Sequence, residues 1–346
     1  MNCVGIDIGG ANIKFANAAG RVHSVAFPLW KRPRELSQVL RETLHARFAG
    51  ADTVLAVMTG ELADCYETRE HGVREIARAL QPAANGRRLA WFGLDQRWYA
   101  TGDLHDRPAL FAASNWLALA RAVAQALDEP DALLLDVGSS TTDIVPIRQG
   151  MPAPHGITDT QRLLHRELVY LGVQRTPLCA VIREAPYRDA AVPVASEWFS
   201  TTLDVFLTLG RLPEGTGAEH TADGRPASRE AARQRLARTV LAIGEGEFSA
   251  HDATRLAEHV ERRIVERITA AVEQVARSRD LPLTHIVVGG GGAFVAEQVL
   301  GRLGVKRSLA TTSQLLGAAT HNCDTALALV RLWQSGSPEK PPDEHK

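Results

Sequence analysis

Two segments of the chain repeat the same plan, 129 positions apart. The first, VGIDIGGANIK at 4–14, has an aspartate in an apolar strand, followed by two glycines, two small residues and a lysine. The second, LLLDVGSSTTDIVPI at 133–147, has an aspartate at the same place in its strand and a loop of small residues before the next strand. Two similar hairpins so far apart predict an α/β chain built from two similar lobes.

The residues that align between the hairpins indicate phosphate and metal chemistry. Asp7 aligns with Asp136, and Lys14 aligns with Asp143. Backbone amides of a glycine turn can cradle an anion, and a divalent cation lets a carboxylate approach that anion. We therefore expect Asp7 and Asp136 to hold Mg²⁺ and the two loops to grip one diphosphate, or the phosphates of a nucleotide. The expected diphosphate-binding residues are Gly9, Gly10, Ala11, Asn12 and Lys14 in the first loop and Gly138, Ser139, Ser140 and Thr141 in the second. Ordinary turn chemistry is the simpler alternative for each hairpin.

A third glycine cluster lies late in the chain, in HIVVGGGGAFVAEQVLGRLG at 285–304. It consists of a β-branched strand, four glycines and an amphipathic helix that is expected to begin near Ala293. Four consecutive glycines carry a large ordering cost, which favours close approach of the backbone to a ligand at Gly290 and Gly291. Tight packing of the helix on its sheet is the alternative.

Composition limits the classes of function. The 346 residues are long enough for two lobes, and the net charge of −1 gives no reason to expect nucleic acid or an anionic membrane surface as a partner. The four cysteines are widely separated, which favours reduced thiols. The first expected strand starts too early for a secretory signal and no apolar run is long enough to span a bilayer, so we expect a cytoplasmic protein.

The remaining pattern predicts one complete α/β unit after the first hairpin. Its ligand is expected at the carboxyl ends of the strands, where Asp7, Thr59, Gly60 and Glu61 would meet. The aromatic residues Trp98, Tyr99 and Trp116 suit either a ring-shaped substrate or the core, and the loop at 213–226 suits either a linker or a lid. The expected strands are 22–28, 53–58 and 89–93, and the expected helices are 34–48, 64–80, 116–127, 253–278 and 314–333.

These hairpins, with the late strand, glycines and helix, resemble the actin, hexokinase and Hsp70 superfamily. Within it, the chain resembles the hydantoinase/oxoprolinase-related branch tied to tetrahydromethanopterin-linked one-carbon metabolism, which is similar to the archaeal methanofuran-biosynthesis synthase. The segments that carry the resemblance are GIDIGGANIK at 5–14, VMTGELADCY at 57–66, ASNW at 113–116, LLLDVGSSTTDIVPI at 133–147, ELVYLGVQRTPL at 167–178, TADGR at 221–225 and VVGGGGAF at 287–294.

The resemblance implies two ribonuclease-H-like, actin-like ATPase lobes around a central ligand cleft. We expect the first lobe at 1–112, the second lobe with insertions at 113–319, and a disordered tail at 335–346. A C-terminal helix at about 320–334 would return to the first lobe.

The resemblance also implies an enzyme, a transferase that joins an (aminomethyl)furanylmethyl diphosphate to the phenol oxygen of a tyramine or tyrosine-type acceptor and releases pyrophosphate. Mg²⁺ and Lys14 would neutralise the leaving group without a requirement for ATP. A phenol needs a base, and the candidates in order are Glu61, Asp143 and Asp64, although Asp64 suits the N-cap of a helix better. The resemblance implies substrate contacts at Asn115, Arg175, Asp223 and Arg225.

Three other functions remain as alternatives. They are an ATP-dependent small-molecule kinase, an ATP-assisted amidohydrolase of the hydantoinase kind, and a non-enzymatic nucleotide-gated assembly protein. A homodimer is compatible with all of these functions.

Overall fold

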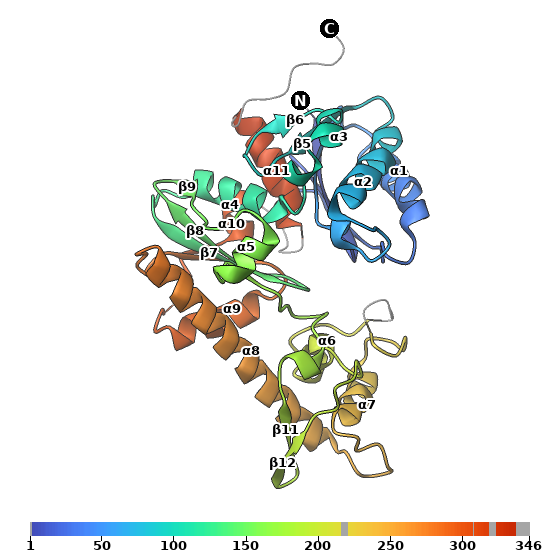
Figure 1. Ribbon diagram of the computed structural model, residues 1–346, viewed down its shortest axis with the longest axis vertical. Coiled ribbons are helices and arrows are strands. Elements are labelled where there is room, and N and C mark those ends of the chain that lie inside the picture. Colours follow the sequence, from blue (N-terminus) through green and yellow to red (C-terminus); the bar gives the residue numbers. More distant parts are fainter. Residues whose placement is uncertain (1, 216–220, 307, 318–322, 337–346) are drawn as a thin grey trace. The chain divides into compact units, whose positions relative to one another are not determined.

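The computed structural model describes residues 2–215, 221–306, 308–317 and 323–336 (Figure 1). The chain forms two compact units. Unit 1 comprises 1–132, 147–159 and 310–346, and unit 2 comprises 133–146 and 160–309. The expected tail and the middle of the loop at 213–226 lie largely outside the described residues.

Unit 1 is built on a mixed six-stranded sheet in the order β3-β2-β1-β4-β5-β6. Strand β1 pairs antiparallel with β2 and parallel with β4, and β4 pairs parallel with β5. Every residue of β1 and β4 is buried, as expected for apolar strands covered on both faces. The elements are β1 Cys3–Ile8, β2 Asn12–Asn17, β3 Val22–Ala26, α1 Leu36–Arg47, β4 Thr53–Met58, α2 Arg69–Ala83, β5 Arg88–Phe92, β6 Trp98–Tyr99, α3 Asp103–Asp106, α4 Asn115–Ala126, β9 Met151–Pro152, β14 Ala310–Thr311, α10 Thr312–Leu316 and α11 Asp324–Ser335.

Helices cover the first sheet on both sides. Helices α1 and α2 pack against each other on one side, and Figure 1 shows α4 and α11 on the other. Helix α4 therefore belongs to unit 1, whereas the sequence placed 113–126 in the second lobe. The physical reason is its apolar surface, which packs against α10 and α11.

The last apolar helix is shorter than the sequence pattern suggested. The expected helix at 314–333 is two helices, α10 and α11, because Gly317 adopts a left-handed conformation and ends α10. Helix α11 packs on β1 so closely that a Cβ atom at Gly5 would lie 1.9 Å from the carbonyl oxygen of Ala326.

The aromatic residues near β6 mostly belong to the core of unit 1. Trp98 and Trp116 are buried, and the ring of Trp98 packs edge-on against Trp333, with centroids 5.1 Å apart. Tyr99 is half-buried and packs against Phe111. Of the two uses considered for Trp98 and Trp116, the structure shows the core.

Unit 2 has a second mixed sheet, in which β10, β8, β7 and β13 are neighbours in that order. Strand β7 pairs parallel with β13, as β1 pairs with β4 in unit 1. Its elements are β7 Ala132–Val137, β8 Thr142–Arg148, α5 Asp159–Leu164, β10 Leu168–Val169, β11 Glu184–Tyr187, β12 Ala190–Pro193, α6 Thr202–Thr208, α7 Arg229–Thr239, α8 Ala250–Ser278, β13 Ile286–Gly289 and α9 Ala293–Arg302. Asp159, the first residue of α5, belongs to unit 1, as do Ala132 at the start of β7 and the last two residues of β8.

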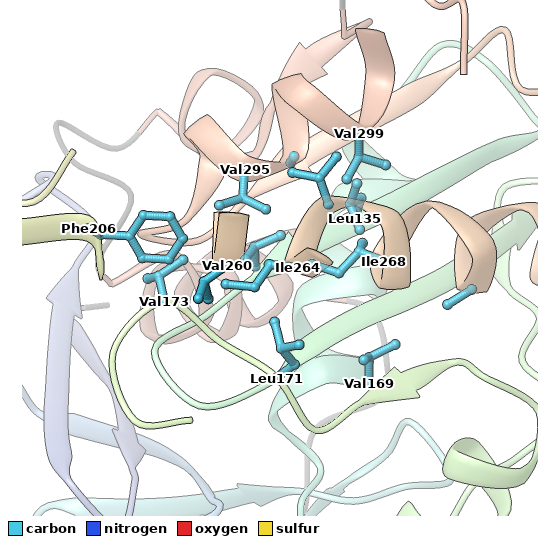
Figure 2. Close-up of a cluster of buried hydrophobic side chains, with 14 of the residues drawn as sticks. Leu135, Val169, Leu171, Val173, Phe206, Val260, Ile264, Ile268, Val295 and Val299 are labelled. Atoms are coloured by element: carbon cyan, nitrogen blue, oxygen red, sulfur yellow. The ribbon is translucent and has the colours of Figure 1, made fainter. Parts of the chain in front are cut away.

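The core of unit 2 lies between the long helix α8, helix α9 and the second sheet. Apolar residues recur at helical spacing along α8, and Val260, Ile264 and Ile268 are fully buried. Figure 2 shows these three side chains among apolar residues of the sheet, of the segment after β10, and of helices α6 and α9. The labelled residues are Leu135 and Val169 in the sheet, Leu171 and Val173 after β10, Phe206 in α6, and Val295 and Val299 in α9.

Candidate functional site

Each of the two hairpin turns contains a hydrogen bond at the equivalent position. In the first turn, the amide of Gly9 donates to the carbonyl of Asn12 at 3.0 Å. In the second, the amide of Gly138 donates to the carbonyl of Thr141 at 2.8 Å. Each bond closes a four-residue turn after a buried strand, so the repeat read from the sequence is also a repeat of backbone geometry.

The first hairpin brings Asp7 and Lys14 together. They are opposite each other in the register of β1 and β2, and Lys14 Nζ lies 4.0 Å from Asp7 Oδ2. Asp7 is buried, while the lysine side chain is 36% exposed. Lys14 thus keeps a cationic group near the carboxylate and still reaches solvent at the turn.

The glycine cluster lies against the second hairpin. A Cβ atom at Gly290, whose φ is +81°, would lie 2.2 Å from the carbonyl oxygen of Val137 and 2.6 Å from Asp136 Oδ1. The amide of Gly292 donates to the same Val137 carbonyl. A side chain at 290 would fill the space beside the Asp136 carboxylate, so only glycine fits there. The exposed Gly291 lies between these two contacts.

Unit 1 contains the same relation in a different sequence. The amide of Thr59, after β4, donates to the carbonyl of Ile8 at 3.0 Å. A Cβ atom at Gly60 would lie 3.4 Å from the carbonyl carbon of Gly9. The Thr59–Gly60 segment therefore lies against the first turn, as the glycine cluster lies against the second strand end.

Glu61 follows this segment and is almost fully buried, with 1% of its surface exposed. In the described part of the chain, neither carboxylate oxygen has a hydrogen-bond partner. Burial raises the pKa of Glu61 to about 8. The backbone of Glu61 itself, the charge of Arg69 and the backbone of Ala113 lower it, and the charge of Asp159 raises it. A buried carboxyl that is this weakly acidic can accept or hold a proton near neutral pH.

The other two base candidates have different surroundings. Asp143 is buried and forms an ion pair with Arg162, whose Nη2 donates to its Oδ1 at 2.7 Å. Asp64 is exposed in the turn before α2. The N-cap of α2 is Thr68, whose hydroxyl accepts from the amide of His71, so the capping role expected for Asp64 is wrong. The helix begins five residues later than 64, and a cap must directly precede it.

Two of the expected substrate-contact residues lie beside other candidates in their own units. The amide of Arg175 donates to the carbonyl of Ser139 at 3.1 Å, which puts it at the second turn. Asn115, the half-buried first residue of α4, follows Ala113, whose backbone lies near Glu61. The segments 57–66 and 113–116 therefore converge in unit 1.

The other two, Asp223 and Arg225, pair with each other. Arg225 Nη2 lies 2.6 Å from Asp223 Oδ2, and Asp223 also accepts from Arg235 at 3.1 Å. Arg235 is fully buried and donates from Nε to Asp204 at 2.7 Å. Burial raises the pKa of Asp204 to about 6 against the opposing effect of Arg235. The structure thus places the TADGR segment in an internal ionic network.

Several of these partners were missed by the sequence analysis. Their ion pairs join residues that are distant in the chain, and no apolar periodicity marks these positions. The residues are Arg162, Arg235, Arg69 and Asp159. Only Asp204 had a local signal, since Thr201 and Asp204 form a capping box at the start of α6.

The described residues contain neither a cluster of metal ligands nor a membrane-spanning helix. There, no three or more His, Cys, Asp or Glu side chains are grouped so that they could hold a metal ion. No described helix is both long enough and apolar enough to cross a bilayer.

Two mixed sheets with duplicated hairpins define a protein with the actin-like ATPase fold. A nucleotide-free acetone carboxylase structure superimposes with a TM-score of 0.51 at 11% identity, covering 85% of this chain and 66% of that chain. The hydantoinase/oxoprolinase family model matches residues 52–326, and the chain belongs to this family. These findings confirm the fold class and the family that the sequence predicted.

Two archaeal relatives share one name, (4-{4-[2-(γ-L-glutamylamino)ethyl]phenoxymethyl}furan-2-yl)methanamine synthase. The protein of Methanocaldococcus jannaschii is 31% identical over 300 residues, which cover 86% of this chain and 88% of the relative. The protein of Methanococcus vannielii is 33% identical over 181 residues, which cover 52% of this chain and 79% of the relative. The chain is thus homologous to enzymes named as synthases.

Proposed function

We propose that the protein is a transferase that forms an aryl ether and releases pyrophosphate in methanofuran-type cofactor biosynthesis. The product in the name of both relatives contains a phenoxymethyl group on a furan ring, which is a phenol oxygen bonded to a furanylmethyl carbon. Making this bond takes a phenol as nucleophile and a furanylmethyl group with a leaving group. A diphosphate leaving group suits a glycine turn with a lysine beside it, as Lys14 lies beside the first turn.

The observation that carries the proposal is the state of Glu61. A phenol has a pKa of about 10, so a carboxylate of ordinary pKa is a weak acceptor for its proton. The burial that raises the pKa of Glu61 to about 8 brings its pKa much closer to that of the phenol. Both of its oxygens lack a hydrogen-bond partner in the described structure, which suits a group whose partner is a substrate.

The proposed step is a single displacement. Glu61 takes the phenol proton, the phenol oxygen attacks the furanylmethyl carbon, and the bond from that carbon to the diphosphate oxygen breaks. The diphosphate leaves with the electron pair of that bond. Lys14 and the amides of the first turn stabilise the charge that gathers on the leaving group.

The donor set around the turns is compatible with Mg²⁺ that arrives with the diphosphate. Magnesium commonly binds through one or two carboxylates together with substrate phosphates and water, so a three-carboxylate cage is not required. Asp7 in unit 1 and Asp136 in unit 2 are the candidate carboxylates, each beside the turn of its own unit, and a bound ion would supply neutralisation of the leaving group. The glycine at 290 lets the backbone approach the Asp136 carboxylate closely.

The direct test is incubation with (aminomethyl)furanylmethyl diphosphate, Mg²⁺ and a panel of tyrosine, tyramine and γ-glutamyltyramine. We expect one ether product by mass spectrometry, with one pyrophosphate released per ether and no need for ATP. The matched control is Glu42→Gln, on the exposed side of α1, which is expected to keep full activity, whereas Glu61→Gln is expected to lose it by about 10²-fold or more. Ether formation by no phenol, together with ATP turnover, would replace the proposal with the kinase alternative.

A further inference from the structure

One ion pair beside Glu61 is unexplained by the displacement itself. Arg69 Nη2 lies 2.7 Å from Asp159 Oδ2, and both side chains are mostly buried, with 27% and 15% of their surfaces exposed. The two residues are 90 positions apart, and both belong to unit 1. The attraction within a partly buried ion pair is stronger than within an exposed pair, but removing the two charges from water costs desolvation free energy.

The geometry of α2 places Arg69 on the side of Glu61. A Cβ atom at Gly72 would lie 2.5 Å from the carbonyl oxygen of Glu61 and 2.7 Å from its Cα, so the helix backbone touches the Glu61 backbone there. Arg69 is three residues before Gly72 and therefore lies on the same face of the helix. Nevertheless the arginine bonds to Asp159, and the Glu61 oxygens stay without a hydrogen-bond partner in the described structure.

We propose that Arg69 and Asp159 are positioning residues for Glu61: Asp159 occupies the guanidinium of Arg69 and so keeps this cation from pairing with the buried carboxyl. The inference rests on the proposed function for its effect on catalysis. If Arg69 were unoccupied, it would stabilise the Glu61 carboxylate and make it a poorer proton acceptor. If Arg69 were absent, Asp159 alone would oppose ionisation of Glu61.

No other charged side chain acts on Glu61 to a comparable degree among the described residues. The neighbouring segment at Ala113 presents its backbone, which lowers the pKa of Glu61 as the backbone of Glu61 itself does. Tyr66 packs against Gly72, and burial raises the pKa of its phenol, so it stays neutral. The two members of the ion pair act on Glu61 with opposite signs, which makes the inference testable.

The test follows the ionisation of Glu61 in four variants. Each variant is compared with a counterpart that also carries Glu61→Gln, and the difference in their melting temperatures is measured from pH 5 to pH 10. The pH at the midpoint of the change in this difference reports the ionisation of Glu61. We expect Asp159→Asn to move the midpoint down by about one pH unit and Arg69→Gln to move it up. The double variant Arg69→Gln/Asp159→Asn returns it near the wild-type value, and Arg69→Lys keeps it there.

The pH profile of kcat/KM for ether formation is the second measurement, and its rising limb should move with the same signs. The control is the ion pair of the half-buried Glu75 and the exposed Arg78 on the same helix, whose variants Glu75→Gln and Arg78→Gln should leave both midpoints in place. Unchanged midpoints in Asp159→Asn and Arg69→Gln, or shifts of the same sign, would overturn the inference even if the ether forms. Shifted midpoints without any ether product would instead overturn the proposed function and leave the inference standing.

Discussion

Glu61 combines two properties that usually exclude each other, deep burial and an unpartnered carboxyl group. Burial of such a group destabilises its charged form, and the protein responds by holding the proton at a higher pH than an exposed glutamate does. A group kept in this state is available for proton transfer to a bound partner. Its burial also affects the stability of the whole unit.

The first prediction concerns stability as a function of pH. In the unfolded chain Glu61 ionises near 4.5, whereas in the folded protein it ionises near 8. Between these values unfolding releases a proton, so the contribution of the protonated group is complete below 4.5 and is lost as the pH rises through 8. Glu61→Gln cannot ionise and should be more stable than the wild type by a few kcal/mol at pH 9, with a much smaller difference at pH 4.5. Thermal unfolding over this pH range measures it; a gain that is equal at both ends would contradict the assignment.

The second prediction concerns the start of α2. Thr68 is the observed N-cap, so Thr68→Ala should lower the free energy of unfolding by about 1 kcal/mol. The neighbouring Asp64→Ala removes an exposed turn residue and should change it by less than about 0.5 kcal/mol. Urea denaturation of the two variants in parallel decides between these caps. Equal losses would mean that the helix starts earlier than the structure shows.

At the residue scale, the sequence revealed candidate site residues that follow strands, but not the residues of the buried ion pairs around them. Glu61 could be selected because it directly follows a buried strand and a glycine. Arg69 and Asp159 could not, since each is one charged residue among many and their contact depends on how distant segments pack. The same reason hides Arg162 and Arg235, whose burial follows from ion pairs and not from any local pattern.

At the scale of elements, each unit places its turn and its next parallel strand in the same relation. Thr59 bonds the end of β1, and Gly292 bonds the end of β7. The strands and most helices were predictable because apolar periodicity decides them, as for β4, whose bounds agree with the expected strand. The divided C-terminal helix was not, because the pattern continues past Gly317 although the backbone turns there.

The third prediction compares two glycines inside helices. At Gly72 in α2, a methyl group would overlap the Glu61 backbone, so Gly72→Ala should destabilise the protein by about 1–3 kcal/mol. At Gly301 in α9, no atom lies within 4 Å of the added Cβ, and Gly301→Ala should stabilise the protein by about 0.5–1 kcal/mol. Denaturation midpoints measure both, and opposite signs are expected. A stabilising Gly72→Ala would refute the close approach of α2 to Glu61.

At the scale of the whole molecule, both units are assembled from segments that are separate in sequence. Unit 1 takes its last helix, α11, from the far end of the described chain, and this helix packs on the central strand β1. At Gly5 the carbonyl oxygen of Ala326 occupies the place that a side chain would take.

The fourth prediction tests this contact. Gly5→Ala forces β1 and α11 apart and should cost about 3 kcal/mol of stability. Gly50→Ala, also in unit 1, meets no atom within 4 Å and should stay within about 0.5 kcal/mol of the wild type. Hydrogen exchange resolved by peptide should show faster exchange in β1 and α11 of the Gly5 variant, with α8 in unit 2 unaffected. Unchanged exchange in β1 and α11 would mean that the two segments are not in contact.

The return of α11 to β1 also has a consequence for biosynthesis. On the ribosome, β1 is translated before every other described element, whereas the helix that covers it, α11, is translated after all of them. Unit 2 is complete in the nascent chain before then. Until α11 is translated, the apolar face of β1 has to be shielded by chaperones or by transient contacts. Premature termination upstream of α11 would yield a polypeptide whose first sheet stays uncovered and prone to aggregate.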